Sequence, residues 1–197
     1  MPRAARGLGA LALVAVLALT GCTEDELADQ YRDGSNKGYI SGDGTVTEID
    51  ASDRDDPIVF SGTDEDGAGV DSADLAGRVV VVNFWYASCA PCRAEAADLE
   101  SVNAEFTGQD VSFVGVNVRD QAPQAAAFAT TYGITYPSIV DVDGSTQLAF
   151  SGKVPPNAVP TTLVLDREGR VASRILGQLP EASILSTLVG DTLAESE

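Results

Sequence analysis

Two cysteines that stand three positions apart are the part of this sequence best suited to chemistry. The segment reads Cys89-Ala90-Pro91-Cys92. Two thiols at this spacing can form a disulfide and exchange it with another protein through a mixed disulfide. A zinc site built from cysteines alone usually needs four thiolates, whereas the chain has three cysteines and no histidine. We therefore expect redox chemistry without a metal or other cofactor, and the lack of histidine also excludes Ser-His-Asp and Cys-His nucleophiles.

The sequence around the pair predicts that a buried strand leads to it and that a helix begins at it. Residues 79–85 are a continuous run of mostly β-branched and aromatic residues, which is typical of a strand buried on both faces. Pro91 suits the first turn of a helix. Cys89 is then expected at the helix N-terminus, where the macrodipole stabilises a thiolate. We expect an exposed, acidic Cys89 that attacks and a buried Cys92 that resolves.

Strands and helices alternate along the rest of the folded region. Expected strands cover 58–61 and the stretch around Val70 (a hairpin), 79–85, 111–118, 134–140, 161–166 and 170–176; expected helical segments cover 93–106, 121–132, 146–150 and 180–193. This alternation predicts an α/β fold with a mixed sheet and helices on both faces. The late hairpin predicts antiparallel strands at one edge.

The N-terminus resembles an export signal that ends at a lipid attachment site. Two arginines precede the apolar run 8–19, which is shorter than the roughly 20 residues that a membrane-spanning helix needs. The sequence 19–22 resembles the bacterial lipobox, whose final cysteine is diacylated. We expect 1–21 to be a lipoprotein signal peptide and Cys22 to anchor the protein on the extracytoplasmic face of the cell membrane. An uncleaved anchor helix is the alternative.

An acidic linker is expected between the anchor and the domain. Residues 22–56 are polar, rich in Gly, Ser and Asp, and without strong periodicity, which predicts a flexible tether; a short strand at 45–49 is the alternative. The folded domain is expected at 57–192, with a tail at 193–197. Asp and Glu total 30 against 12 Lys and Arg, a net charge of −18. Nucleic acid is therefore a poor partner, because phosphate binding needs Lys and Arg.

The active-site segment 83–95 resembles that of the TlpA/ResA-like family of thioredoxin-fold proteins. Its strand ends in Asn-Phe-Trp, Cys-x-Pro-Cys follows, and a glutamate comes three residues later. The segments 72–78, 136–141 and 159–166 fit the same family, so the resemblance covers 57 to about 192. It implies a thioredoxin-like fold, with a central mixed β-sheet flanked by helices, an N-terminal β-hairpin and a central insertion.

The resemblance also implies roles for individual residues. Cys89 and Cys92 form the catalytic dithiol and its disulfide. The Val159-Pro160 bond is expected to be cis, in a loop that faces the cysteines and, with Trp85, contacts the substrate chain. Glu95 matches the family's active-site glutamate and is expected to hold or accept the proton of the resolving thiol; a solvated helix residue is the alternative.

These features predict a membrane-tethered thiol-disulfide oxidoreductase. The resemblance implies that it reduces specific protein disulfides, with apocytochrome c as one candidate client and a membrane thiol-transfer protein as electron donor. Ser88 departs from the tryptophan usual in the family before the first cysteine, so the site is expected to be more open. Two alternatives stay open: a disulfide-forming oxidant on the same scaffold, and a non-catalytic binding lipoprotein with a structural disulfide.

Overall fold

A computed structural model gives the fold of the chain and describes residues 46–155 and 158–195. A six-stranded mixed sheet forms its centre, in the order β1-β8-β7-β4-β5-β6. β4 pairs in parallel with β5, and β5 with β6, whereas β7, β8 and β1 add antiparallel strands on the other side. The strands are β1 (Val46–Glu48), β4 (Val79–Trp85), β5 (Val111–Asn117), β6 (Ser138–Val140), β7 (Thr161–Leu165) and β8 (Val171–Leu176).

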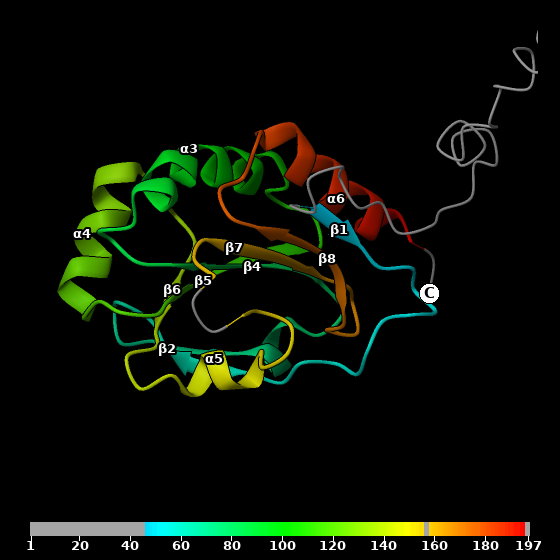
Figure 1. Ribbon diagram of the computed structural model, residues 1–197, viewed down its shortest axis with the longest axis horizontal. Helices are drawn as coiled ribbons and strands as arrows, with labels where there is room; N and C mark the ends of the chain where they lie inside the picture. The colour runs from blue at the N-terminus through cyan, green and yellow to red at the C-terminus, as the bar shows by residue number, and fades with distance from the viewer. Residues whose placement is uncertain (1–45, 156–157, 196–197) are drawn as a thin grey trace, which may run out of the picture. The chain divides into compact units, whose positions relative to one another are not determined.

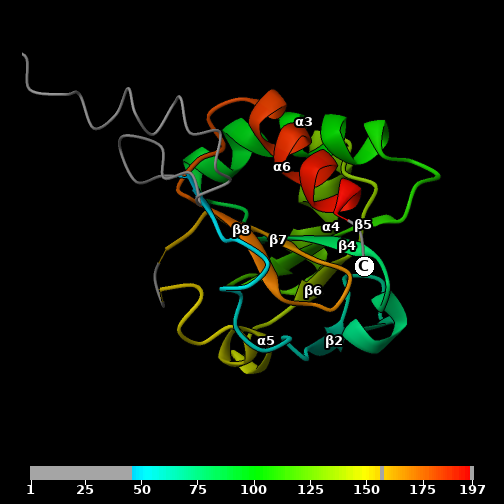
Figure 2. The same cartoon turned by 90° about the vertical axis from the view of Figure 1, so that its right-hand side faces the viewer.

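Helices and a hairpin cover the two faces of this sheet (Figure 1). Figures 1 and 2 agree in placing α3 and α6 on one face, and α5 with β2 on the other. The helices are α3 (Ala90–Glu105), α4 (Ala122–Tyr132), α5 (Ser145–Ala149) and α6 (Ala182–Ala194), with a short 3-10 helix η1 (Ser72–Leu75); the hairpin joins β2 (Ser61–Thr63) to β3 (Gly69–Asp71). The predicted α/β class, mixed sheet, hairpin and flanking helices are thus confirmed.

The central strand β4 is buried along its whole length, as its continuous apolar run predicts. Successive side chains of a strand point to opposite faces. Val79 and Val81 therefore pack under α3 and α6, while Val80, Val82 and Phe84 belong to the core on the α5 side. β4 thus determines where the chain leaves the sheet and in which direction it runs toward Cys89.

The domain begins earlier than the boundary expected at residue 57. Val46 is buried and pairs with Ile175 of β8, so the alternating patch at 45–49 contributes an edge strand instead of tether. The Arg54 side chain, 3% exposed, bonds Asp166 at 3.0 Å and Glu195 at 2.6 Å. This ion-pair cluster and β1 hold 46–56 on the domain and extend the folded part beyond 192.

The remaining N-terminal expectations lie outside the described residues. They are the signal peptide 1–21, the lipidated Cys22 and the tether as far as residue 45. Within 46–155 and 158–195, no helix has the length and apolar character to cross a membrane.

Candidate active site

Cys89 and Cys92 form a disulfide at the N-terminus of α3, with an S–S distance of 2.04 Å. Cys89 is the N-cap residue, Pro91 lies in the first turn, and the Cys92 backbone N–H donates to Cys89 Sγ at 3.2 Å. The sulfur therefore occupies the place of a capping side-chain oxygen, at the positive end of the helix dipole. A thiolate released on reduction of this bond would be stabilised by the same N–H and dipole.

The structure corrects the expectation that Cys89 is exposed. Cys89 is 3% exposed and Cys92 is 2% exposed, so both sulfurs are buried to a similar extent. They belong to one apolar cluster with Trp85, Ala96, Ala125 and Phe128, against which Tyr86, Ala87 and Val159 also pack. Cys89 is buried because these side chains pack around it. Its position at a helix terminus does not reveal this packing. Ser88 and Ala90, on either side of Cys89, are exposed and mark where a client chain can approach.

Four hydrogen bonds hold the loop that precedes Cys89. The backbone N–H of Ala87 donates to Asp120 Oδ2 at 2.5 Å, and its carbonyl accepts from Arg93 Nη1 at 3.1 Å. The Tyr86 carbonyl accepts from Cys89 N, and that of Trp85 accepts from Val118 N. The Arg119 guanidinium also stacks on the Tyr86 ring, 4.0 Å from its centroid. The loop is therefore fixed by side chains of the β5–α4 connection and of α3, which sequence reasoning did not identify.

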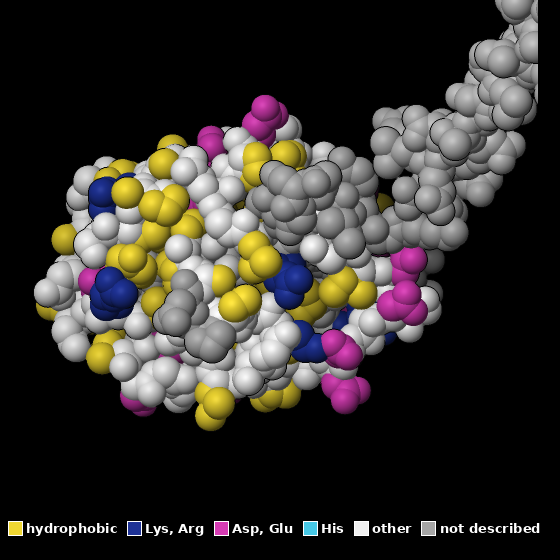
Figure 3. All heavy atoms as spheres, in the orientation of Figure 1, with side chains coloured by type: hydrophobic (Ala, Val, Ile, Leu, Met, Phe, Trp, Pro, Cys, Tyr) yellow, Lys and Arg dark blue, Asp and Glu magenta, His cyan; other side chains and the backbone are white. Residues whose placement is uncertain are grey.

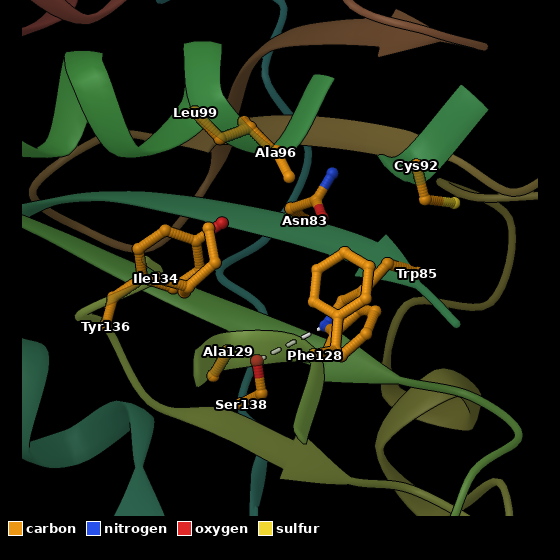
Figure 4. Close-up of a pocket in the computed structure, with 10 residues that line it drawn as sticks. All are labelled: Asn83, Trp85, Cys92, Ala96, Leu99, Phe128, Ala129, Ile134, Tyr136 and Ser138. Atoms are coloured by element: carbon orange, nitrogen blue, oxygen red, sulfur yellow. Dashed lines mark hydrogen bonds between the residues drawn. The ribbon is translucent and has the colours of Figure 1, made fainter. Parts of the chain in front are cut away.

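Trp85 is packed beside the cysteines and not free to move. Its Nε1 donates to Ser138 Oγ at 3.2 Å, and its ring lies 4.2 Å from the Phe128 ring between centroids, as Figure 4 shows. Gly115 leaves room for this arrangement, because a Cβ there would collide with Ser138 Oγ and lie 2.8 Å from Trp85 Nε1. Trp85 is expected to contact the substrate chain, and in this structure it is 5% exposed.

A small cavity of about 10 Å³ lies next to Cys92, which is room for about one water molecule. Figure 4 shows its lining: apolar side chains predominate, and the polar groups include the amide of Asn83 and the hydroxyl of Ser138. Cys92 therefore borders a cavity that can hold one small polar group, such as a single water molecule.

The loop before β7 completes the site. The Val159-Pro160 bond is cis, as the sequence predicts. Val159 packs on the cluster that contains both cysteines. The Pro160 carbonyl accepts from Gly177 N at 2.9 Å, which ties the loop to the end of β8.

Glu95 lies one turn beyond Cys92 on α3 and is fully buried. Its Oε1 accepts from Asn83 Nδ2 at 3.0 Å, and its Oε2 accepts from the Leu179 backbone N–H at 2.7 Å. Burial raises the pKa of Glu95 from 4.5 to about 7, although these two hydrogen bonds oppose the rise. A carboxyl with this pKa can hold or release a proton near neutral pH, and the alternative of a solvated helix residue is wrong.

Asn83 connects Glu95 to the neighbouring strand. Its Nδ2 also donates to Thr162 Oγ1 at 3.0 Å, and Asn83 is paired with Thr162 across β4 and β7. The sequence carries no sign of the Asn83–Thr162 bond or of the Glu95–Leu179 bond, because Thr162 and Leu179 are distant in the chain from their partners. The signals for Glu95 were its place three residues after Cys92 on the helix and its match to the family's glutamate.

A Cys-x-x-Cys disulfide at the start of a helix, after a central strand and beside a cis-proline loop, defines a thioredoxin-like fold with a redox-type site. The chain belongs to the Redoxin family, whose model matches residues 49–189. It is 31% identical to the thiol-disulfide oxidoreductase ResA of Bacillus subtilis over 121 residues, 61% of this chain and 65% of that protein. The chain thus spans just under two thirds of that relative's length, and the expected ResA-like resemblance is confirmed.

Two solved structures extend the likeness over the whole fold. A secreted thiol-disulfide isomerase from Corynebacterium glutamicum is 30% identical, with a TM-score of 0.72 over 81% of this chain and 100% of that one. A DsbF homologue from Corynebacterium diphtheriae is 34% identical, with a TM-score of 0.67 over 80% of this chain and 99% of that one. Thiol-disulfide chemistry is named for two of these three relatives, the ResA oxidoreductase and the secreted isomerase.

Proposed function

We propose that this chain is a thiol-disulfide oxidoreductase that works outside the cytoplasm and reduces disulfides in client proteins. The observation that carries the proposal is the Cys89–Cys92 disulfide, capping α3 and packed against Val159 of the cis-proline loop. A purely structural disulfide over so short a loop would contribute little chain entropy. The names of the ResA and isomerase relatives support the same chemistry.

The reaction starts from the reduced pair. The Cys89 thiolate attacks one sulfur of the client disulfide, and the other client sulfur leaves and takes up a proton. Cys92 then loses its proton and attacks Cys89 Sγ, so that the second client sulfur leaves. Two electrons pass from the dithiol to the client, and the Cys89–Cys92 disulfide remains. An extracytoplasmic electron donor, which we expect to be a membrane thiol-transfer protein, reduces it again.

Glu95 is the group that we assign to the proton of Cys92. The two residues are one helical turn apart, and both are buried. Burial disfavours the thiolate of Cys92, so its proton needs an acceptor for resolution to be fast. Asn83 lines the same cavity as Cys92 and donates to Glu95, so the cavity beside the thiol reaches a hydrogen-bond partner of the carboxylate.

Glu95 is the feature of the site that favours a reductant over an oxidant. A dithiol is strongly oxidising when its thiolate is stabilised, as in DsbA. An ionised Glu95 one turn away, in the protein interior, opposes a second negative charge on the sulfurs. The reduced pair is therefore poised to give up its electrons, and we expect a reduction potential nearer to about −270 mV than to about −120 mV.

Two further proposals, for the membrane anchor and for the client protein, rest on the N-terminal sequence and on the family resemblance. We propose that Cys22 carries lipid and holds the protein at the cell membrane, where apocytochrome c is one client. Replacement of Cys22 by alanine should move the exported protein from the detergent phase to the aqueous phase. A wild-type protein found in the aqueous phase would remove this part of the proposal and leave the redox activity untouched.

An insulin-reduction assay tests the activity itself. The full chain should reduce insulin in the presence of a thiol donor, and its equilibrium with glutathione should give a potential in the reducing range. Cys89→Ser should abolish turnover. Cys22→Ser, which removes the third cysteine, should keep it. Equal background rates for wild type and Cys89→Ser would refute the proposal, and a potential near that of DsbA would make the protein an oxidant.

A further inference from the structure

The charges of this protein are distributed unevenly around the active site. The fold brings four stretches to the cysteine end of the sheet: 84–94, 118–128, 158–162 and 176–180. Glu95 and Glu181 come directly after two of these stretches, and Asp141 follows β6, whose C-terminal end lies beside that of β5. Glu95 and Asp141 are buried. Within the four stretches, the single Asp or Glu is Asp120. Its Oδ2 accepts from Ala87 N and Asn117 Nδ2, so this carboxylate is engaged within the loop.

Two arginines flank the loop that precedes Cys89. Arg93 donates to the Ala87 carbonyl, and Arg119 stacks on the Tyr86 ring. Within the described residues, neither arginine makes an ion pair. Four other Lys and Arg residues do, and they lie outside the four stretches: Arg54, Lys153, Arg167 and Arg170. In Figure 3, Lys and Arg groups appear at the edge where Figure 1 shows α4.

In the part of the chain that the structure describes, the other two Lys or Arg side chains without an ion pair lie elsewhere. Arg78 precedes β4 at the far end of the sheet, where it donates to Ser112 Oγ and to the carbonyls of Gln109 and Val111. Arg174 on β8 donates to the Lys153 carbonyl. Among the described residues, the arginines without an ion pair beside the Cys89 loop are therefore Arg93 and Arg119. The carboxylates of this site, Asp120 and Glu95, are held by hydrogen bonds inside the protein.

Arg119 is suited to bind a charged partner. It is exposed, and its stacking on Tyr86 fixes the guanidinium plane, so little side-chain entropy is left to lose when a carboxylate binds. The guanidinium presents a fork of N–H donors that matches a carboxylate. Tyr86 precedes Cys89 by three residues, so a group bound here lies within a few residues of the attacked client sulfur.

We propose that the preferred clients carry an acidic side chain within a few residues of the reactive cysteine, bound by Arg119 with help from Arg93. This inference rests on the proposed oxidoreductase function and names its substrate class. The acidic remainder of the surface acts against such clients at long range, but at physiological ionic strength a Debye length of about 8 Å screens charges outside the site. The contact with Arg119 is short and survives this screening.

Matched peptides test the inference. Three peptides share one intramolecular disulfide and differ only in the residues that flank each cysteine, which are Asp, Asn or Lys. Using the reduced full chain at about 0.15 M salt, we expect kcat/KM for the Asp peptide to exceed that for the Asn peptide by about threefold to tenfold. The Lys peptide should be the slowest. Arg119→Gln should bring the Asp-to-Asn ratio close to one, whereas Arg167→Gln, at the opposite end of β7, should leave the ratio unchanged.

The outcomes separate this inference from the proposed function. Equal rates for the three peptides, or a preference for the Lys peptide, overturn the inference if insulin is still reduced. The inference is also overturned if Arg119→Gln and the double variant Arg93→Gln/Arg119→Gln both keep the preference for the Asp peptide. If insulin and all three peptides stay oxidised, the oxidoreductase proposal fails and the client class fails with it.

Discussion

Glu95 allows the electrostatics of the site to be tested through stability alone. The unfolded chain releases the Glu95 proton near pH 4.5, whereas the folded protein keeps it to about pH 7 because the carboxyl is buried. The folded state therefore binds more protons in this interval, and stability falls as the pH rises through it. At about 1.4 kcal/mol for each pKa unit, the rise corresponds to about 3 kcal/mol of stability lost between pH 4.5 and 8.

Glu95→Gln removes this titration with little change of shape. The Gln oxygen can accept from Leu179 N, and its amide can donate to Asn83 if the Asn83 amide turns over. Thr162 can still bond the turned Asn83, because a hydroxyl both donates and accepts. Any fixed cost of the exchange is the same at every pH. We therefore expect the free energy of unfolding of Glu95→Gln minus that of wild type to increase by about 3 kcal/mol from pH 4.5 to 8.

Denaturant unfolding of the oxidised protein at several pH values gives this difference directly. Asp98→Asn is the matched control, since Asp98 raises the pKa of Glu95 only as the smallest of the contributing causes. Its stability difference from wild type should change much less with pH. If the Glu95→Gln difference is constant between pH 4.5 and 8, Glu95 titrates normally in the folded state, and its role as a proton acceptor near pH 7 loses its basis.

Three further predictions concern catalysis and packing. Glu95→Gln should slow resolution of the mixed disulfide by about tenfold to a hundredfold at pH 7, seen as accumulation of the Cys89-linked adduct; an unchanged rate contradicts the assignment. Arg54→Met should lower the free energy of unfolding by about 2 kcal/mol, because buried Asp166 loses one of its two arginine partners and keeps Arg170; a loss below about 1 kcal/mol would show that the Arg54 ion pairs do not hold this segment. Gly115→Ala should destabilise the protein by about 1–3 kcal/mol and shift the emission of Trp85, the single tryptophan; unchanged emission would mean that Ser138 moves instead.

The sequence was sufficient where the information is local. The apolar run of β4, the proline in the first turn of α3 and the Cys-x-x-Cys spacing are contiguous signals, and together they specify a strand-to-helix corner with two thiols. The 161–176 hairpin and α6 were likewise predicted to within a residue or two.

Other features depend on contacts between distant residues and left no local signal. β1 is three residues long and is stabilised by pairing with β8, 129 positions further on at Val46 and Ile175. The burial of Cys89 comes from packing by Val159 and Phe128. The partners of Glu95 and the Asp120 contact to Ala87 likewise need the folded chain before they exist.

Trapping the mixed disulfide tests the central claim most directly. The full-length Cys92→Ala variant, reduced and mixed with a disulfide-bonded peptide, has no resolving thiol and should remain joined to the peptide through Cys89. We predict that mass spectrometry finds one peptide per protein, linked at Cys89 and released by dithiothreitol, and that the Cys89→Ala/Cys92→Ala variant forms no such adduct at the active site. A Cys92→Ala protein that stays free of adduct, while the same peptide reacts with thioredoxin, would contradict a nucleophilic Cys89 and with it the proposed function.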